Sequence, residues 1–258
     1  MSALNICIKP DRCIVLQDAA AYDPEGRVTQ FMDKGQIVRQ NGLFVAATGL
    51  TVTAVAFAQF AERFVGIDHL ASCGEAIIDE WYDQYVTILF SSELKDHLGV
   101  LVAFVGWSEE HDRPMCVVYT AGIEGRAFAV DVGTLTHPQL EGAFRSEWMA
   151  GSSVYLNIDT FDAVRDGRRL MELQRAQPAR HRPDRSGQFL IGGHVKLTEV
   201  FRDRIEQRVL HEWTEDVVGE RIRPAPRLDP VSHPNVAALT ANRAERRRIE
   251  KLQRRGAA

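Results

Sequence analysis

Ser2 follows Met1, so removal of that methionine would leave a side-chain hydroxyl and a free α-amine on one residue. An α-amine has a reference pKa of about 7.7–8.0, so near neutral pH it can accept a proton where an ordinary lysine amine cannot. A serine hydroxyl becomes an effective nucleophile when such a base lies beside it. We therefore expect Ser2, exposed after loss of Met1, to attack a carbonyl carbon in an acyl-transfer reaction.

Asp18 and Lys34 are spaced so that both can lie beside Ser2. Asp18 follows Ser2 at the same interval at which Lys34 follows Asp18. Asp18 ends a predicted strand that returns toward the N-terminus, and Lys34 stands just before the next predicted strand. A lysine cation here would lower the pKa of the Ser2 amine and hydroxyl, and Asp18 would keep the lysine charged. The alternative for each residue alone is a solvated surface charge.

Hydrophobic periodicity indicates the elements that must position these residues. Apolar residues alternate with polar ones in short segments, or fill them completely, which is typical of strands. The predicted strands span 4–9, 13–18, 36–39, 43–48, 100–107, 115–120, 126–131 and 188–198. Apolar residues at helical spacing predict helices over 52–64, 68–90 and 160–175. The predicted apolar sides of these helices include Val52, Val55, Ile77 and Val164.

The order of these elements favours an α+β fold. Strands come first, followed by two helices, more strands, a helix and a last strand. Helices therefore do not alternate with every strand, as they do in a doubly wound parallel sheet. Two antiparallel sheets packed face to face, with helices outside, fit the order better. Asn41 and Gly42 are typical of a tight hairpin between the third and fourth strands.

The segment from Ser2 through Leu50 resembles the opening of proteasome β-type subunits and their bacterial relatives, including the heat-shock peptidase. Those proteins begin with a nucleophile, a strand ending in Asp, a loop, a Lys, and a strand that ends in a glycine turn before a long helix. The counterparts here are Ser2, Cys13–Asp18, Lys34 and Ala46–Gly49. The resemblance implies the four-layer αββα sandwich of N-terminal-nucleophile (Ntn) hydrolases. It also implies cleavage of peptide or other amide bonds through an acyl-enzyme.

The resemblance assigns further roles residue by residue. The backbone N–H groups around Gly49 would hold the oxyanion, although a glycine here can equally be a simple turn between strand and helix. Ser152 resembles a supporting serine of the family. Asp184 and Ser186 resemble an Asp, Ser and Gly segment before a late strand, with a spacing one residue short. Each of these three can also be an ordinary loop residue.

Two positions depart from the family pattern, and the chain is extended at its C-terminal end. Ala20 stands where the family often has Arg, and Ala3 where it often has Thr. These departures leave the substrate pocket open. The chain beyond Phe201 is longer than the family usually carries. As partners, the resemblance implies self-assembly into a ring-like homo-oligomer, a peptide or protein substrate, and an ATPase that feeds it.

The sequence gives no signal for a cofactor or a metal. Glycine-rich nucleotide loops and metalloprotease motifs do not occur. The four cysteines show no CxxC spacing and are interpreted as buried thiols in a reducing compartment. No apolar run approaches the roughly 20 residues that span a bilayer, and the N-terminal segment lacks the pattern of a secretory signal. We therefore expect a cytoplasmic protein without cofactor, metal or membrane partner.

Two domains are predicted, a hydrolase domain over 1–222 and a Pro-rich linker with a basic tail over 223–258. The net charge of the chain is -4, whereas its last 18 residues hold seven Lys or Arg and two Glu. Only this tail could contact nucleic acid, and a solvated helix or a segment that docks on a partner protein is the alternative. Two functions remain beside a hydrolase: a non-catalytic subunit that keeps the fold for assembly, or a structural or virion-associated protein with a basic arm.

Overall fold

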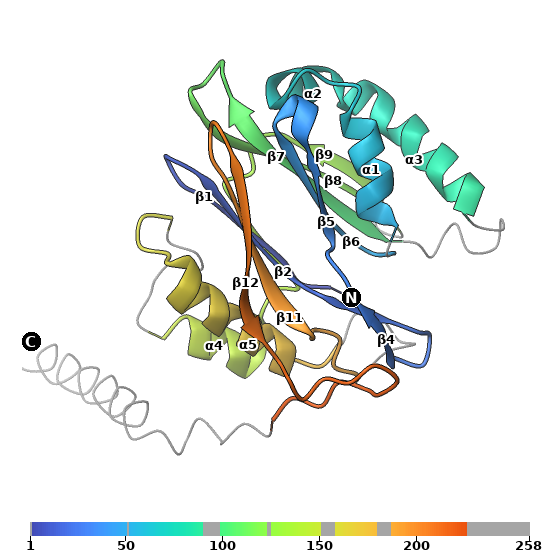
Figure 1. The fold of residues 1–258 in the computed structure, drawn as a ribbon, viewed down its shortest axis with the longest axis vertical. Helices are drawn as coiled ribbons and strands as arrows, with labels where there is room; N and C mark the ends of the chain where they lie inside the picture. The colour runs from blue at the N-terminus through green and yellow to red at the C-terminus, as the bar shows by residue number, and fades with distance from the viewer. Residues whose placement is uncertain are drawn as a thin grey trace, which may run out of the picture. The chain divides into compact units, whose positions relative to one another are not determined.

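The computed structural model describes residues 2–50, 52–89, 99–122, 125–150, 158–179 and 187–225 (Figure 1). The chain divides into two units, Met1–Arg223 and Pro224–Ala258. All the elements below belong to the first unit, a mixed α+β structure whose described residues form antiparallel sheets and five α-helices.

The first sheet holds the N-terminal hairpin at its centre and has the strand order β10-β1-β2-β11-β12. Its strands are β1 (Leu4–Ile8), β2 (Cys13–Asp18), β10 (Thr134–His137), β11 (His194–Val200) and β12 (Ile205–Glu212). All four neighbouring pairs are antiparallel. The late strand β11 therefore lies directly beside β2, although the two are far apart in the sequence.

The second sheet is a meander with the order β5-β6-β7-β8-β9. Its strands are β5 (Gly35–Val38), β6 (Leu43–Thr48), β7 (Val100–Ser108), β8 (Arg113–Gly122) and β9 (Gly125–Ala129). The predicted hairpin between β5 and β6 is present, and its Gly42 has a φ of 62°, which favours glycine. A small hairpin of β3 (Ala20–Tyr22) and β4 (Val28–Phe31) connects the two sheets in sequence.

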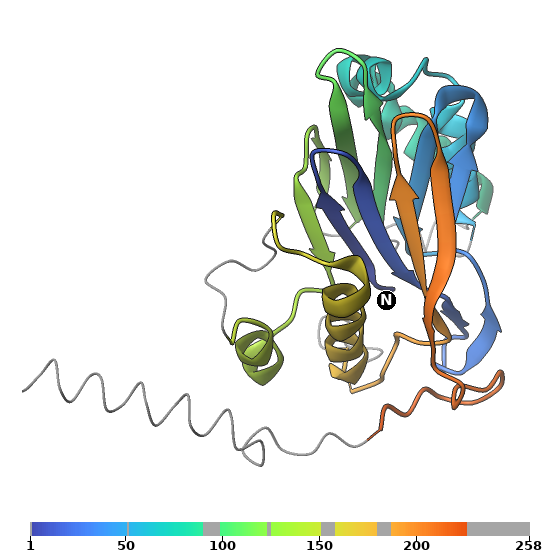
Figure 2. The same ribbon diagram turned by 60° about the vertical axis from the view of Figure 1, so that its left-hand side comes forward.

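Each large sheet is covered by its own helices (Figures 1 and 2). On the second sheet lie α1 (Thr53–Ala61), α2 (Ile67–Cys73) and α3 (Glu75–Leu89). Beside the first sheet lie α4 (Gly142–Trp148) and α5 (Arg168–Ala176), the latter preceded by a π-helical turn over Ala163–Gly167. Among the described residues, no helix combines the length and the apolar character that crossing a membrane requires.

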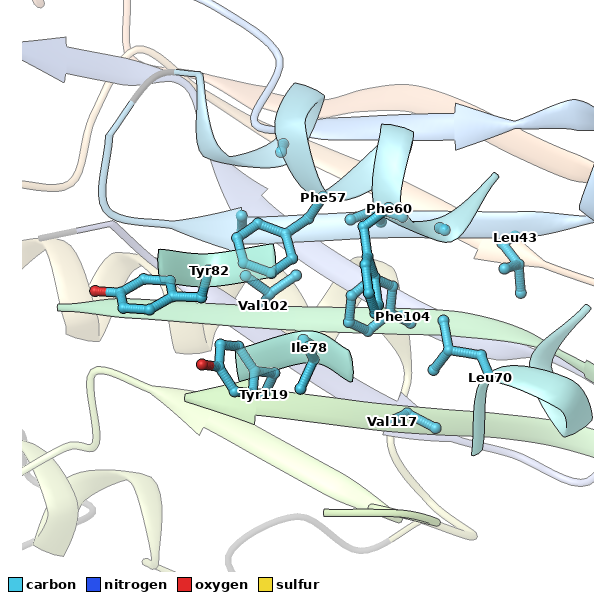
Figure 3. Packing of buried hydrophobic residues seen from close by; sticks show 14 of the residues in the cluster. Leu43, Phe57, Phe60, Leu70, Ile78, Tyr82, Val102, Phe104, Val117 and Tyr119 are labelled. Carbon is cyan, nitrogen blue, oxygen red and sulfur yellow. The ribbon is translucent and has the colours of Figure 1, made fainter. Parts of the chain in front are cut away.

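The buried apolar residues form three main clusters that follow this arrangement. The first packs α1, α2 and α3 on the second sheet, with Phe57, Phe60 and Phe104 at its centre (Figure 3). The second joins strands of the two sheets, and the third packs α5 and α4 on the first sheet.

Strands β1 and β2 are buried on both faces. Successive side chains of a strand point to opposite sides, so Ile6 and Val15 belong to the cluster between the sheets, whereas Cys7 and Ile14 face the helices. Every residue of both strands is accordingly buried. The N-terminal hairpin therefore packs against the second sheet on one face and against helices on the other.

The structure corrects the predicted helices in two places. The single helix expected over 68–90 is two helices, α2 and α3, separated at Gly74, where a Cβ would lie 2.5 Å from the carbonyl oxygen of Leu70. The helix expected over 160–175 begins with a π turn, in which the Gly167 N–H bonds to the carbonyl of Asp162. This wider turn breaks the 3.6-residue period on which the prediction depended.

The four valine and isoleucine side chains named above are largely exposed rather than buried. Val164, in the π turn, is 54% exposed, and Val52, Val55 and Ile77 are 44%, 46% and 36% exposed. The exposed strands β4 and β12 were not predicted because few of their residues are buried, whereas the strand predicted over 126–131 is present as β9. The strand expected over 188–198 begins only at His194, since the residues before it form an irregular turn.

We expect the substitution Phe57→Ala to lower the free energy of unfolding by about 3–5 kcal/mol, because it empties a fully buried aromatic position. Ring centroids of Phe60, Phe104 and Tyr119 lie 6.0–6.3 Å from that of Phe57. Val55→Ala, on the exposed side of the same helix, should change it by less than about 0.5 kcal/mol. Urea unfolding measures both, and equal effects would contradict this packing.

Candidate functional site

The structure brings Ser2, Asp18 and Lys34 together. The Nζ of Lys34 lies 2.9 Å from Oδ2 of Asp18 and 3.0 Å from Oγ of Ser2. The side chains of Asp18 and Lys34 are 0% and 9% exposed. Ser2 is only 6% exposed, which corrects the expectation of an exposed residue. The contact between these three residues is therefore an interior one.

The pairing of β1 with β2 positions Asp18. Leu4 pairs with Gln17, so Asp18 lies opposite the residue before β1. The backbone N–H of Ala3 donates to Oδ1 of Asp18 at 2.8 Å. The tight turn between the two strands thus sets the register that places a carboxylate beside the backbone next to Ser2.

Lys34 comes from the other sheet, immediately before β5. Its carbonyl oxygen accepts from the side-chain amide of Gln17 at 3.0 Å and from the N–H of Ala47 at 3.2 Å. Gln17 belongs to the first sheet and Ala47 to the second. The backbone of Lys34 is therefore held by both sheets, and its ammonium reaches back to Asp18 at the end of β2.

Burial lowers the pKa of Lys34 below its usual value, and the nearby Asp18 carboxylate opposes this effect without cancelling it. The expectation that Asp18 simply keeps this lysine charged is therefore incomplete. A lysine with a lowered pKa loses its proton more readily, and its neutral amine can accept a proton from a hydroxyl within hydrogen-bonding distance. Ser2 provides such a hydroxyl.

Tyr22 is a site residue that the sequence patterns missed. Its hydroxyl donates to the carbonyl oxygen of Leu190, and its ring centroid lies 6.0 Å from the Nζ of Lys34. Burial raises the pKa of Tyr22 well above its usual value, and the charges of Asp18 and Asp216 raise it further. Tyr22 was interpreted as the start of a loop. The available signal was an aromatic residue between Asp18 and Lys34.

A Gly-Gly turn before β11 supplies a further partner for Asp18. The N–H of Gly192 donates to Oδ2 of Asp18 at 3.3 Å, and its carbonyl accepts from Ala19 and Ala20 at 3.1 Å each. Asp18 thus has backbone donors on both oxygens in addition to Lys34, as a buried carboxylate requires. A Cβ on Gly192 would lie 2.2 Å from the side chain of Ile222, so only glycine fits.

The other predicted site residues are not shown to join this group. Gly49 follows β6 with a φ of 111°, and the atoms closest to a Cβ placed on it belong to Gly99, Val100 and Thr53. Its role as an oxyanion donor stays a prediction. Ser152, Asp184 and Ser186 lie outside the described residues.

Three of the four cysteines are buried, and Cys73 is exposed. Burial raises the pKa of Cys7, Cys13 and Cys116, so these thiols stay protonated near neutral pH. Within the part of the chain that the structure describes, no cluster of His, Cys, Asp or Glu has the arrangement of a metal site.

The lowered pKa of Lys34 predicts how stability depends on pH. Between that pKa and the usual value of 10.5, the unfolded chain binds more protons than the folded one, so the free energy of unfolding rises with pH. We expect Lys34→Met to abolish this increase in the free energy of unfolding with pH. Urea unfolding from about pH 8 to about pH 11 measures it.

Lys196→Met is the matched control, since Lys196 also pairs with a carboxylate, Asp33 at 3.2 Å, but does so in a more exposed position. It should leave the rise in place. If Lys34→Met and the unmodified protein show the same dependence of stability on pH, the proposed shift in Lys34 is wrong.

Comparison of the chain with protein-family models and with curated proteins found no match. Membership of the proteasome-like family therefore stays a prediction from the first segment of the sequence.

Proposed function

We propose that this chain is an N-terminal serine hydrolase with the four-layer αββα architecture of the Ntn hydrolases. In this proposal it cleaves peptide or other amide bonds through an acyl-enzyme on Ser2. The observation that carries the proposal is the position of the Lys34 ammonium, 3.0 Å from the Ser2 hydroxyl and 2.9 Å from Asp18, in the interior.

The arrangement of the three main apolar clusters supports the architecture. One cluster joins helices to the second sheet, one joins the two sheets, and one joins the first sheet to α5 and α4. This succession is what a helix–sheet–sheet–helix sandwich requires, because each sheet then buries both of its faces. The site residues come from the two inner layers.

Two amines are available to activate Ser2 in this mechanism. Removal of Met1 frees the α-amine of Ser2, with a reference pKa of about 7.7–8.0, and burial lowers the pKa of Lys34. Either amine, when neutral, can take the hydroxyl proton as Oγ forms a bond to the substrate carbonyl carbon. Asp18 holds Lys34 in position through the 2.9 Å ion pair.

The remaining steps follow from acyl transfer. The tetrahedral intermediate collapses with cleavage of the carbon–nitrogen bond, and the leaving amine takes the proton that the base received. Water then adds to the carbonyl carbon of the Ser2 ester and gives a proton to the base. The second tetrahedral intermediate collapses with cleavage of the carbon–Oγ bond, Oγ takes that proton, and the acid is released. Backbone N–H groups around Gly49 are the proposed donors to the oxyanion, a contribution of several kcal/mol when geometry is right.

A second candidate is a non-catalytic subunit that keeps the same fold for assembly. The 6% exposure of Ser2 favours it, because a substrate carbonyl must reach Oγ for the first candidate to operate. The resemblance extends both candidates to a cytoplasmic, ring-like homo-oligomer. An ATPase partner belongs to the first.

The test is the intact mass of the protein before and after a peptide epoxyketone, which reacts only where a free α-amine and a hydroxyl stand on one residue. We expect loss of Met1 and one adduct per chain. Ser2→Ala should form none and lower hydrolysis at least about 1,000-fold. Because Ser2 is buried and accepts from Lys34, this variant should lose about 1 kcal/mol of stability and remain folded.

Ser146→Ala is the matched control, as Ser146 is exposed on α4, and it should form the adduct like the unmodified protein. A Ser2→Ala protein that hydrolyses substrate as fast as the unmodified one contradicts the mechanism. Retained Met1 with no adduct would instead favour the non-catalytic subunit.

A further inference from the structure

The turn over Leu190–Gly193, which presents Gly192 to Asp18, is hydrogen-bonded along its whole length. Its four carbonyl oxygens and two glycine N–H groups have hydrogen-bond partners in three segments of the chain: 18–22, Arg175 and 213–216. The carbonyl oxygens of Leu190, Ile191 and Gly193 accept from Tyr22 Oη, Arg175 Nη1 and Trp213 N, respectively, and that of Gly192 accepts from Ala19 N and Ala20 N. The N–H groups of Gly192 and Gly193 donate to Asp18 Oδ2 and Asp216 Oδ2, respectively.

A buried ion pair lies directly behind this turn. Arg175 of α5 and Asp216, in the segment after β12, are 4% and 1% exposed. Nη1 and Nη2 of the guanidinium each lie 2.7 Å from one oxygen of the carboxylate. The guanidinium carbon lies 4.6 Å from the ring centroid of Trp213. The pair thus has the bidentate geometry in which arginine cannot be replaced by lysine without loss.

The pair contacts the same turn at two positions, one on each side of Gly192. Arg175 donates to the carbonyl of Ile191 at 2.9 Å, and Oδ2 of Asp216 accepts from the Gly193 N–H at 2.7 Å. Gly192, the residue between them, has no room for a side chain: a Cβ there would lie 2.5 Å from Asp216 Oδ2 and 3.0 Å from Arg175 Nη1. The pair therefore contacts the backbone on both sides of Gly192 and leaves no room for a side chain there.

A buried ion pair is weak evidence for stability, because the loss of hydration of two charges offsets most of their attraction. Its geometric effect is more specific here. The N–H of Gly192, the residue that the pair flanks, donates to the carboxylate of Asp18, which is paired with Lys34. A single residue, Gly192, therefore lies between the ion pair and the candidate site.

We propose that Arg175 and Asp216 are positioning residues for the candidate site: they fix the Gly192–Gly193 turn, and through the Gly192 N–H they hold Asp18 against Lys34. The effect of these two residues on catalysis rests on the proposed function. Their effect on the position of Asp18 does not depend on it.

The same C-terminal segment also holds the hairpin that carries Tyr22. The N–H of Val28 in β4 donates to the carbonyl of Glu220 at 2.8 Å, and the N–H of Gly219 donates back to Val28 at 2.7 Å. Arg27 forms an isolated bridge with Arg221. The stretch beyond β12, which exceeds the usual length of the family that the sequence resembles, thus supports the Gly192–Gly193 turn and the β3–β4 hairpin together.

The decisive experiment compares Asp216→Asn with Glu215→Gln. Asn has nearly the shape of Asp but cannot complete the charged, bidentate pair. Glu215 also pairs with Arg175, at 3.1 Å, but is 53% exposed. Both substitutions remove one negative charge near Arg175, so Glu215→Gln measures the effect of the charge without the effect on the turn.

The readout is the titration of Lys34, followed by NMR in protein labelled on its five lysines. Lys34 faces Asp18 of β2, Tyr22 of β3 and the hydroxyl of Ser2. A loosened turn admits water to the ammonium, and because loss of hydration is the largest effect on the pKa of Lys34, Asp216→Asn should raise this pKa despite the loss of one negative charge and a weaker contact with Asp18. Loss of a negative charge alone lowers it, so Glu215→Gln should leave it unchanged or slightly lower.

A second variant guards against a folding defect. Arg175→Lys keeps the charge but loses the two-point contact, and it should raise the pKa of Lys34 in the same direction. In the activity arm, reaction with the peptide epoxyketone should slow at least about 10-fold in Asp216→Asn and stay within about 2-fold in Glu215→Gln.

The titration of Lys34 and the epoxyketone reaction test the positioning role and the hydrolase proposal separately. If folded Asp216→Asn and Arg175→Lys titrate at Lys34 as the unmodified protein does, the positioning role is overturned, whatever the activity. If the unmodified protein forms no adduct while Asp216→Asn still shifts the Lys34 titration, the hydrolase proposal is overturned and the positioning role stands.

Discussion

The structure depends on one interaction, the ion pair between the buried ammonium of Lys34 and the carboxylate of Asp18. The Nζ of Lys34 is almost removed from water, and its attraction to Asp18 does not fully compensate for the lost hydration. Such a pair persists only where the surrounding backbone holds both charges in place. Here that backbone includes the start of β1, the end of β2, the entry to β5 and the turn before β11. The four segments come from both sheets, so the ion pair is also a point at which the sheets are joined.

The hydrogen bonds of Asp18 show how the surroundings meet this requirement. Its carboxylate accepts from Ala3 and Gly192 as well as from Lys34. The Ala3 contact is local and comes from the β1–β2 register, whereas the Gly192 contact depends on β11, α5 and the segment after β12. The site is therefore built in two parts, a hairpin that supplies the charged groups and a C-terminal support that fixes their geometry.

Sequence patterns predicted the first part and not the second. The bounds of β2 and β6 agree with the prediction because both strands begin with a continuous apolar run, and the position of Asp18 follows from the local register of β1 and β2. Tyr22, Gly192 and the Arg175–Asp216 pair carry no local period, because their partners are distant along the chain. Edge strands such as β12, with mostly exposed residues, likewise give no alternation to detect.

The distance along the chain between Asp18 and Gly192, 174 residues, has a consequence for biosynthesis. The central strand β2 reaches its neighbour β11, and the carboxylate its last donor, only when most of the polypeptide has left the ribosome. Contacts of such sequence separation form late, since loop closure must precede them. A nascent chain that ends before Gly192 therefore carries Ser2, Asp18 and Lys34 without the backbone donor that Gly192 gives to Asp18. Full support of the Asp18 carboxylate is in this way coupled to synthesis of the segment that carries Gly192.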